Sequence, residues 1–142
     1  HTMTDSNGIV VCMEVTSASV HDTVMSHDLI DKAQLSEVDT VYADKGYHSE
    51  QNKEILERRN LIDRIMHKRK CNEPGNETTV NRNKSISRRH YVVERTFGSL
   101  KRRYGWGRTR YIGLLKTTFY QQMRCLAFNI KRTMKLISLS PI

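Results

Sequence analysis

Two carboxylates, Asp44 and Glu94, have the sequence surroundings expected of residues that do chemistry. Asp44 follows an apolar segment, residues 38–43, and precedes the turn sequence Lys45-Gly46-Tyr47. This predicts that Asp44 lies at the C-terminal end of a strand, where open α/β sheets place ligand-binding groups. The alternative is that Asp44 is an ordinary turn or cap residue, because Asp is common in turns.

Glu94 is conspicuous because of the charge around it. Residues 1–71 hold 9 Lys and Arg against 12 Asp and Glu, whereas residues 72–142 hold 15 Lys and Arg against three Glu. After Glu77 the only carboxylate is Glu94. A stretch with this much positive charge favours a polyanionic partner. A carboxylate within it weakens the attraction for that partner, which suggests that Glu94 has another role. Carboxylates can share Mg²⁺, which prefers oxygen ligands and can act on phosphodiesters. The alternative is a surface ion pair with a neighbouring base.

The helix that carries Glu94 is predicted from an apolar stripe. Its members recur at helical spacing: Val93, Phe97, Leu100 and Tyr104. Glu94 flanks this stripe, and Lys101, seven residues later, lies almost directly above it. The pattern therefore predicts that Glu94 lies at the edge of the core.

The remaining elements are predicted from apolar periodicity and turn residues. The turn Asp5-Ser6-Asn7-Gly8 predicts a hairpin over 1–16 with a tight primed turn. Further elements are a helix over 22–34, a buried strand over 38–43, a helix over 49–60, a strand over 61–66, a loop over 71–85, and long helices over 86–104 and 115–137. In the last helix we expect a core face of Leu115, Phe119, Met123, Leu126 and Ile130. This order predicts an α/β fold with helices on the faces of a sheet.

Composition excludes several classes of protein. The 142 residues amount to about one domain. The longest apolar run, Ile9–Met13, is far below the ~18 residues of a membrane span, so no membrane association is expected. Three widely spaced Cys indicate a reducing compartment.

Two segments of the chain resemble the DDE-type transposases of bacterial insertion sequences. Tyr42-Ala43-Asp44-Lys45-Gly46-Tyr47 is similar to the strand end that carries the second acidic residue of that family. The segment Tyr91–Arg102 is similar to the helix that carries its final Glu, with Lys101 at the family's spacing from Glu94. The family's Arg four residues before the Glu is replaced by His90.

The resemblance implies a ribonuclease-H-like mixed sheet with flanking helices, which lacks its first strand in this chain. Two Asp and one Glu would hold two Mg²⁺ (or Mn²⁺) ions. Asp44 would be the second Asp and Glu94 the last ligand, both metal-binding and catalytic, and no residue here is a good candidate for the first Asp. The implied organisation is a truncated α/β core over 1–70, a flexible loop over 71–85, and basic helices over 86–142.

The implied activity is phosphodiester hydrolysis at transposon ends and strand transfer into target DNA, in the bacterial cytoplasm at the nucleoid and by a homodimer when the protein is intact. This chain alone is expected to be inactive. The candidate DNA-binding residues are Tyr91, Lys101, Arg102, Arg103, Arg108 and Arg110. For Lys101, Arg102 and Arg103 the alternative is a solvated basic face, and salt-dependent DNA binding would decide between the two. Tyr104, Trp106 and Tyr111 could stack on a base or act as packing anchors.

Two other hypotheses stay open. The chain could be a catalytically dead, basic nucleic-acid-binding remnant of a transposase, which a stop codon or frameshift upstream of His1 would support. It could also belong to a nuclease that only hydrolyses DNA, which strand-transfer products would exclude.

Overall fold

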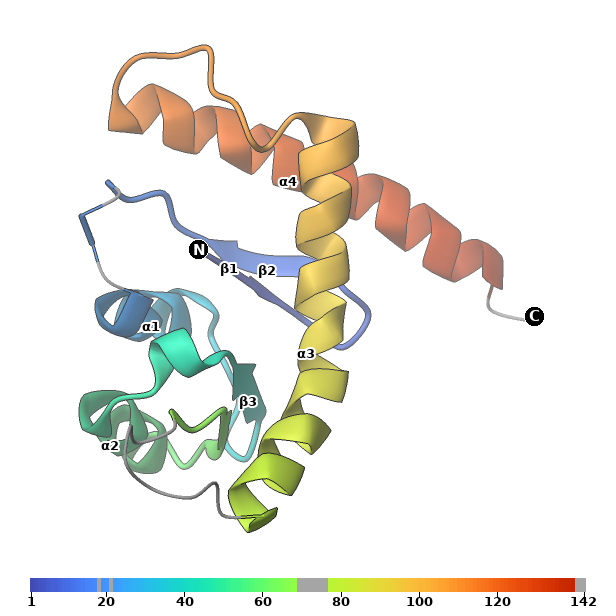
Figure 1. The fold of residues 1–142 in the computed structure, drawn as a ribbon. Coiled ribbons are helices and arrows are strands. Elements are labelled where there is room, and N and C mark those ends of the chain that lie inside the picture. Colours follow the sequence, from blue (N-terminus) through green and yellow to red (C-terminus); the bar gives the residue numbers. More distant parts are fainter. Residues whose placement is uncertain (18, 21, 69–76, 140–142) are drawn as a thin grey trace. The chain divides into compact units, whose positions relative to one another are not determined.

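The computed structural model describes residues 1–17, 19–20, 22–68 and 77–139, and for 22–26 the backbone alone. The elements are β1 (Thr2–Thr4), β2 (Val10–Met13), α1 (Asp22–Lys32), β3 (Thr40–Ala43), the 3₁₀ turn η1 (Lys45–Tyr47), α2 (Glu50–Arg58), β4 (Ile62–Ile65), α3 (Glu77–Tyr104) and α4 (Leu114–Leu139) (Figure 1). None of the described helices is long and apolar enough to span a membrane.

The chain forms two compact units. Unit 1 comprises His1–Ser19 and Val92–Ile142, and unit 2 comprises Val20–Tyr91. The predicted organisation grouped residues 1–70 together, whereas the N-terminal hairpin belongs with the C-terminal helices. The reason is specific pairing: the Asn129 side chain in α4 accepts a hydrogen bond from Val10 N at 2.9 Å and donates to Val10 O at 2.8 Å.

The predicted hairpin is confirmed, but its turn differs from the prediction. Strands β1 and β2 pair antiparallel, with Thr4 opposite Val10, so residues 5–9 form the connection. The Asp5 carboxylate accepts hydrogen bonds from the backbone N–H groups of Asn7 (2.9 Å) and Ile9 (2.8 Å). This Asx-type bonding competes with the two-residue turn that Asn-Gly favours, and Gly8 alone supplies a left-handed backbone, at φ +78°.

The core of unit 1 lies where the hairpin, α3 and α4 meet. Its buried cluster consists of Val10, Leu100, Cys125 and Phe128. The apolar stripe predicted in α3 is confirmed in part: Leu100 is fully buried, and the other three residues of the stripe are half-buried. Thr96 was not predicted to be internal, yet it is buried and its hydroxyl donates to Gly8 O at 3.3 Å.

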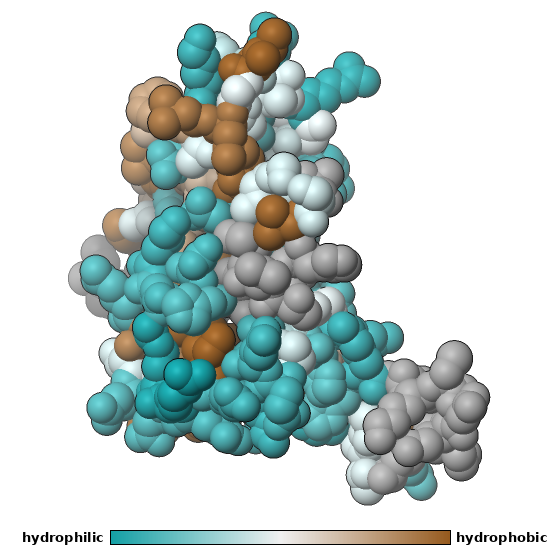
Figure 2. Space-filling model, turned by 90° about the vertical axis from the view of Figure 1, so that its left-hand side faces the viewer, coloured by the Kyte–Doolittle hydropathy of each residue, from teal (hydrophilic) through white to brown (hydrophobic). Residues whose placement is uncertain are grey.

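Helix α4 does not bury the face that its apolar spacing predicts. Leu115 is 85% exposed and Phe119 62% exposed, and the other three predicted core residues are exposed as well. The buried residues of α4 are Gln121, Cys125 and Phe128, on another face of the helix. The prediction is wrong because periodicity identifies an apolar face of a helix without identifying a partner that covers it. Figure 2 shows apolar surface over the start of α4.

Unit 2 is a β-α-β arrangement that also contains α1 and the N-terminal part of α3. Strands β3 and β4 pair in parallel, in register from Thr40 with Ile62 to Ala43 with Ile65, and η1 and α2 connect them. The expected burial of β3 is wrong, because Thr40 and Tyr42 are exposed, and within the described residues β3 pairs with β4 alone. The strand also starts later than predicted, since Val38 has φ +70°, outside the β region.

The loop predicted over 71–85 is wrong where the structure describes it, because α3 already begins at Glu77; residues 71–76 lie outside the described residues. Tertiary contacts explain the helix. Arg82 donates to Ile65 O at 2.8 Å, and the Asn83 amide pairs with both backbone groups of His67. Such contacts override weak local helix propensity. The α/β class is confirmed, with the described strands in two small sheets.

Candidate functional site

Asp44 lies where the sequence places it, directly after β3. Its backbone is extended, its side chain is exposed, and its Oδ1 accepts a hydrogen bond from Lys45 N at 2.5 Å. The carboxylate is thus the N-cap of η1, as the turn interpretation predicted. The cap also holds an exposed carboxylate at the C-terminal edge of a parallel strand pair, which is the position that favours a ligand-binding role.

A buried amide holds the turn that follows Asp44. Asn52 is 1% exposed, and its Nδ2 donates to Tyr47 O at 2.6 Å. Ser49 caps α2 by accepting from Asn52 N at 3.2 Å, and Tyr47 N donates to Asp44 O at 3.1 Å. This chain of bonds ties Asp44 to the first turn of α2. The helix predicted over 49–60 begins close to its expected start, whereas the role of Asn52 was not predicted; its spacing of three residues from Ser49 is the available signal.

Two histidines also lie in this part of unit 2. The rings of His48, after η1, and His67, after β4, are 4.9 Å apart between centroids and tilted by 60°. Burial is the main cause that lowers the pKa of His67, and the positive charge of Arg82 adds to it. His67 is therefore held neutral near pH 7. No role was predicted for either histidine.

Glu94 lies on α3 in unit 1 and is exposed, so it sits further from the core than predicted. At about 100° per residue, Lys101 lies within about 20° of Glu94 around the helix. The Lys101 ammonium contacts the Phe97 ring, 5.7 Å from its centroid. The predicted neighbourhood of Glu94 and Lys101 on one helix face is thus present.

Asp44 belongs to unit 2 and Glu94 to unit 1. Among the described residues, no three His, Cys, Asp or Glu side chains gather as a metal-binding cluster. The donor chemistry of the two carboxylates still suits a cation such as Mg²⁺, because both offer charged oxygen atoms at exposed positions.

All six predicted DNA-binding residues are exposed, Tyr91 in unit 2 and the five basic residues in unit 1. Besides Lys101 at the Phe97 ring, two of the bases make local contacts: Arg102 Nε donates to Gly98 O at 3.2 Å, and the backbone O of Arg108 accepts from Arg124 at 3.3 Å. These contacts leave the residues at the surface, where phosphate groups can reach them.

The aromatic residues near the connection between α3 and α4 are mostly packing residues. Tyr104 is half-buried and packs edge-to-face on Phe128, with centroids 5.8 Å apart. Trp106 is half-buried against Phe97 at 5.9 Å, and its backbone N–H donates to Leu100 O. Tyr111 is 47% exposed and stacks edge-on against Tyr120. Of the three aromatic residues, Tyr111 is the most exposed.

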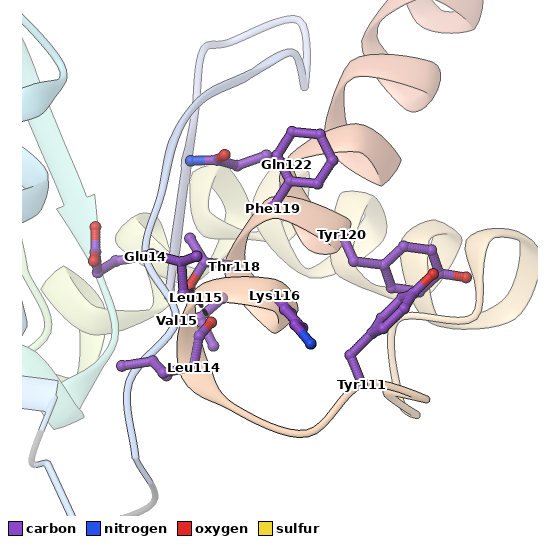
Figure 3. Close-up of a pocket in the computed structure, with 10 residues that line it drawn as sticks. All are labelled: Glu14, Val15, Tyr111, Leu114, Leu115, Lys116, Thr118, Phe119, Tyr120 and Gln122. Atoms are coloured by element: carbon purple, nitrogen blue, oxygen red, sulfur yellow. Dashed lines mark hydrogen bonds between the residues drawn. The ribbon is translucent and has the colours of Figure 1, made fainter.

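An open apolar pocket of about 810 Å³ lies beside the start of α4 (Figure 3). Val15, Leu115 and Phe119 line it, and Tyr111 and Tyr120 form its other side. Its charged lining residues among those described are Glu14 and Lys116. The pocket contains none of the predicted catalytic residues, and its walls are formed largely by the exposed apolar face of α4.

Comparison with known proteins supports the motifs. The family described as the transposase DDE domain matches residues 1–130, which include both carboxylate motifs. The chain is 35% identical over 138 residues to the transposase for insertion sequence element IS1106 of Neisseria meningitidis serogroup B.

That alignment covers 97% of this chain and 47% of the relative, so the chain spans about half the length of that protein. No solved structure matches. The match over most of the chain confirms the resemblance that the two motifs indicated: this chain belongs to the DDE transposase family.

Proposed function

We propose that Asp44 and Glu94 are two carboxylates of a transposase catalytic site built on a ribonuclease-H-like sheet. The intact protein would hydrolyse phosphodiester bonds at transposon ends and transfer the freed strand into target DNA, acting as a homodimer. The observation that carries this proposal is the family match over residues 1–130, which includes both motifs, together with the exposure of both carboxylates.

The two side chains suit a divalent metal ion. Each supplies hard oxygen ligands, the type that Mg²⁺ and Mn²⁺ take in phosphoryl-transfer sites. When bound, such ions would activate the attacking oxygen and stabilise the departing one. The chain's own contribution is to hold Asp44 on a turn tied to α2 through Asn52, and to present Glu94 on a continuous helix.

The basic residues have a separate role in this proposal. Lys101 lies on the same side of α3 as Glu94, where it can bind a phosphate next to the carboxylate. Arg102, Arg103, Arg108 and Arg110 are exposed bases that follow along the chain, and Tyr91 adds a further exposed hydroxyl. Their proposed task is to hold the DNA backbone.

The experiment is a transposition assay with the intact gene product in Mg²⁺ or Mn²⁺. Asp44→Asn and Glu94→Gln each remove a charge and keep the shape of the side chain. We expect each to lower strand cleavage by more than about 100-fold, since loss of a ligand should exceed the 10- to 100-fold cost of losing an outer-shell partner.

Matched controls are Asp39→Asn and Glu77→Gln, which remove exposed carboxylates in unit 2 that lie outside both motifs. The controls should retain activity. Cleavage that survives both Asp44→Asn and Glu94→Gln would refute the assigned site. Hydrolysis without any strand-transfer product would instead identify a nuclease.

A further inference from the structure

A narrow groove in unit 1 runs between the C-terminal half of α3 and the second half of α4. Its volume is about 300 Å³. Five of its lining side chains are basic: Arg95, Arg103, Lys131, Arg132 and Lys135. Four of the five are outside the set of DNA-binding residues predicted from the motifs: Arg95 on α3 and the three bases on α4. The groove is therefore a basic surface that the motifs did not predict as a whole, and it shares only Arg103 with that set.

The floor of the groove is well supported. Tyr104 from α3 and Phe128 from α4 pack edge-to-face, and Phe128 belongs to the core cluster. Thr96 is buried and bonded to the hairpin turn at Gly8. Arg132 Nε donates to Asn7 O at 2.9 Å, which anchors that guanidinium beside the same turn. The bases are thus carried by two helices that pack on one core.

The charge of the groove is unbalanced. Among the described residues that line it, none is Asp or Glu. Along the chain, Glu94 is the one carboxylate after Glu77, so the sequence offers few others to neutralise these bases. Like charges gathered on one surface repel one another, and a bound polyanion relieves that repulsion. This favours a phosphate-rich ligand.

The spacing of the bases favours an extended ligand over a single small anion. Arg95, Ser99 and Arg103 follow one another at successive turns of α3, a row about 12 Å long. One strand of a DNA duplex presents a phosphate every ~3.4 Å along the duplex axis, so the row matches several phosphates. Arginine, lysine and a serine hydroxyl bind phosphates well and position DNA without reading its sequence.

The groove lies on a different side of α3 from Glu94. At about 100° per residue, Arg95, Ser99 and Arg103 lie between about 100° and 180° around the helix from Glu94. Lys101, by contrast, lies within about 20° of Glu94. DNA held in the groove is therefore not the segment that lies against the carboxylate.

We propose that this groove binds the sugar–phosphate backbone of a second duplex DNA segment, independently of sequence. The identification of the polyanion as DNA rests on the proposed function. The binding itself requires neither the carboxylates nor a metal ion. A protein that joins two DNA segments needs more than one such surface.

The test measures duplex binding by the 142-residue chain in EDTA over a range of salt concentrations. Lys131→Gln/Lys135→Gln removes two exposed groove bases. We expect the slope of log affinity against log salt to fall by about 2, because each phosphate contact contributes about 1. The matched control is Lys84→Gln/Lys116→Gln, which makes the same change in net charge at exposed lysines outside the groove.

The control should leave the slope nearly unchanged. An equal decrease of the salt slope in both double variants would overturn the proposal, because DNA binding would then follow net charge alone. A loss confined to one of two unrelated duplexes would also overturn it, since the groove would then read bases. Competition by inorganic phosphate as strong as that by duplex DNA would show a small-anion site instead.

Two further variants separate this proposal from the proposed function. In EDTA, Asp44→Asn should bind duplex DNA with unchanged affinity and slope, and Glu94→Gln should bind it at least as tightly as the unaltered chain, because that change removes a negative charge from a basic helix. If they abolish transposition and the groove variants still bind normally, the groove is refuted and the catalytic site stands. If the groove variants lose DNA binding and the carboxylate variants remain active in transposition, the catalytic site is refuted and the groove stands.

Discussion

Helices α3 and α4 are similar in length, 28 and 26 residues, but they use their apolar residues differently. In α3 the apolar stripe faces the core of unit 1, and Leu100 is fully buried. In α4 the stripe is exposed, and the buried face contains Gln121, Cys125 and Phe128 instead. The comparison shows that an apolar period predicts a helix, whereas burial depends on which face finds a partner.

The largest expected difference is between two leucines. Leu100→Ala removes a fully buried side chain and should lower the free energy of unfolding by about 2–5 kcal/mol. Leu126→Ala makes the same chemical change where the side chain is 52% exposed, and should cost less than about 0.5 kcal/mol. Urea unfolding of both variants, followed by the fluorescence of Trp106, measures the stability of unit 1, because Trp106 is the single tryptophan of the chain. Equal losses would show that α4 also buries its apolar stripe.

The second prediction concerns the thiol on the buried face of α4. Burial raises the pKa of Cys125 from 9.0 to about 11. At a given pH below 9 this leaves about 100-fold less thiolate, the reactive form. Alkylation of Cys125 at pH 8 should therefore be about 100-fold slower than in urea, measured by mass spectrometry of the peptide that contains it. Fast alkylation of the folded chain would mean that this face of α4 opens to solvent.

The third prediction tests the bond between α4 and the hairpin. Asn129→Ala leaves the N–H and C=O of Val10 without their amide partner and should cost about 1–3 kcal/mol. Gln122→Ala removes an exposed amide from the same helix and should be close to neutral. Both are measured by urea unfolding. A neutral Asn129→Ala would indicate that β2 is held to α4 by the apolar core alone.

Local patterns in the sequence were sufficient to predict much of the fold. The hairpin, the helix that begins near residue 49 and the strand end at Asp44 each depend on neighbouring residues, and each is present. The family was also predicted correctly from two short motifs, because the chemistry of a site constrains residue types at short spacings.

Features that depend on distant residues were not predictable in this way. The start of α3 at Glu77 depends on contacts of Arg82 and Asn83 with the end of β4. The grouping of the hairpin with the C-terminal helices depends on Asn129, more than one hundred residues from Val10. Such pairings leave no periodic signal along the chain.

The smallest expected effect on stability comes from the exposed stripe itself. Phe119→Gln/Leu126→Gln replaces two exposed apolar side chains with polar ones of similar length and should change the free energy of unfolding by less than about 0.5 kcal/mol. It should also lower the binding of the dye ANS, which takes up exposed hydrophobic surface. Gln122→Ser, on the exposed surface of the same helix, should leave dye binding unchanged. A large loss of stability in the double variant, without loss of dye binding, would mean that the stripe is covered and that α4 resembles α3 after all.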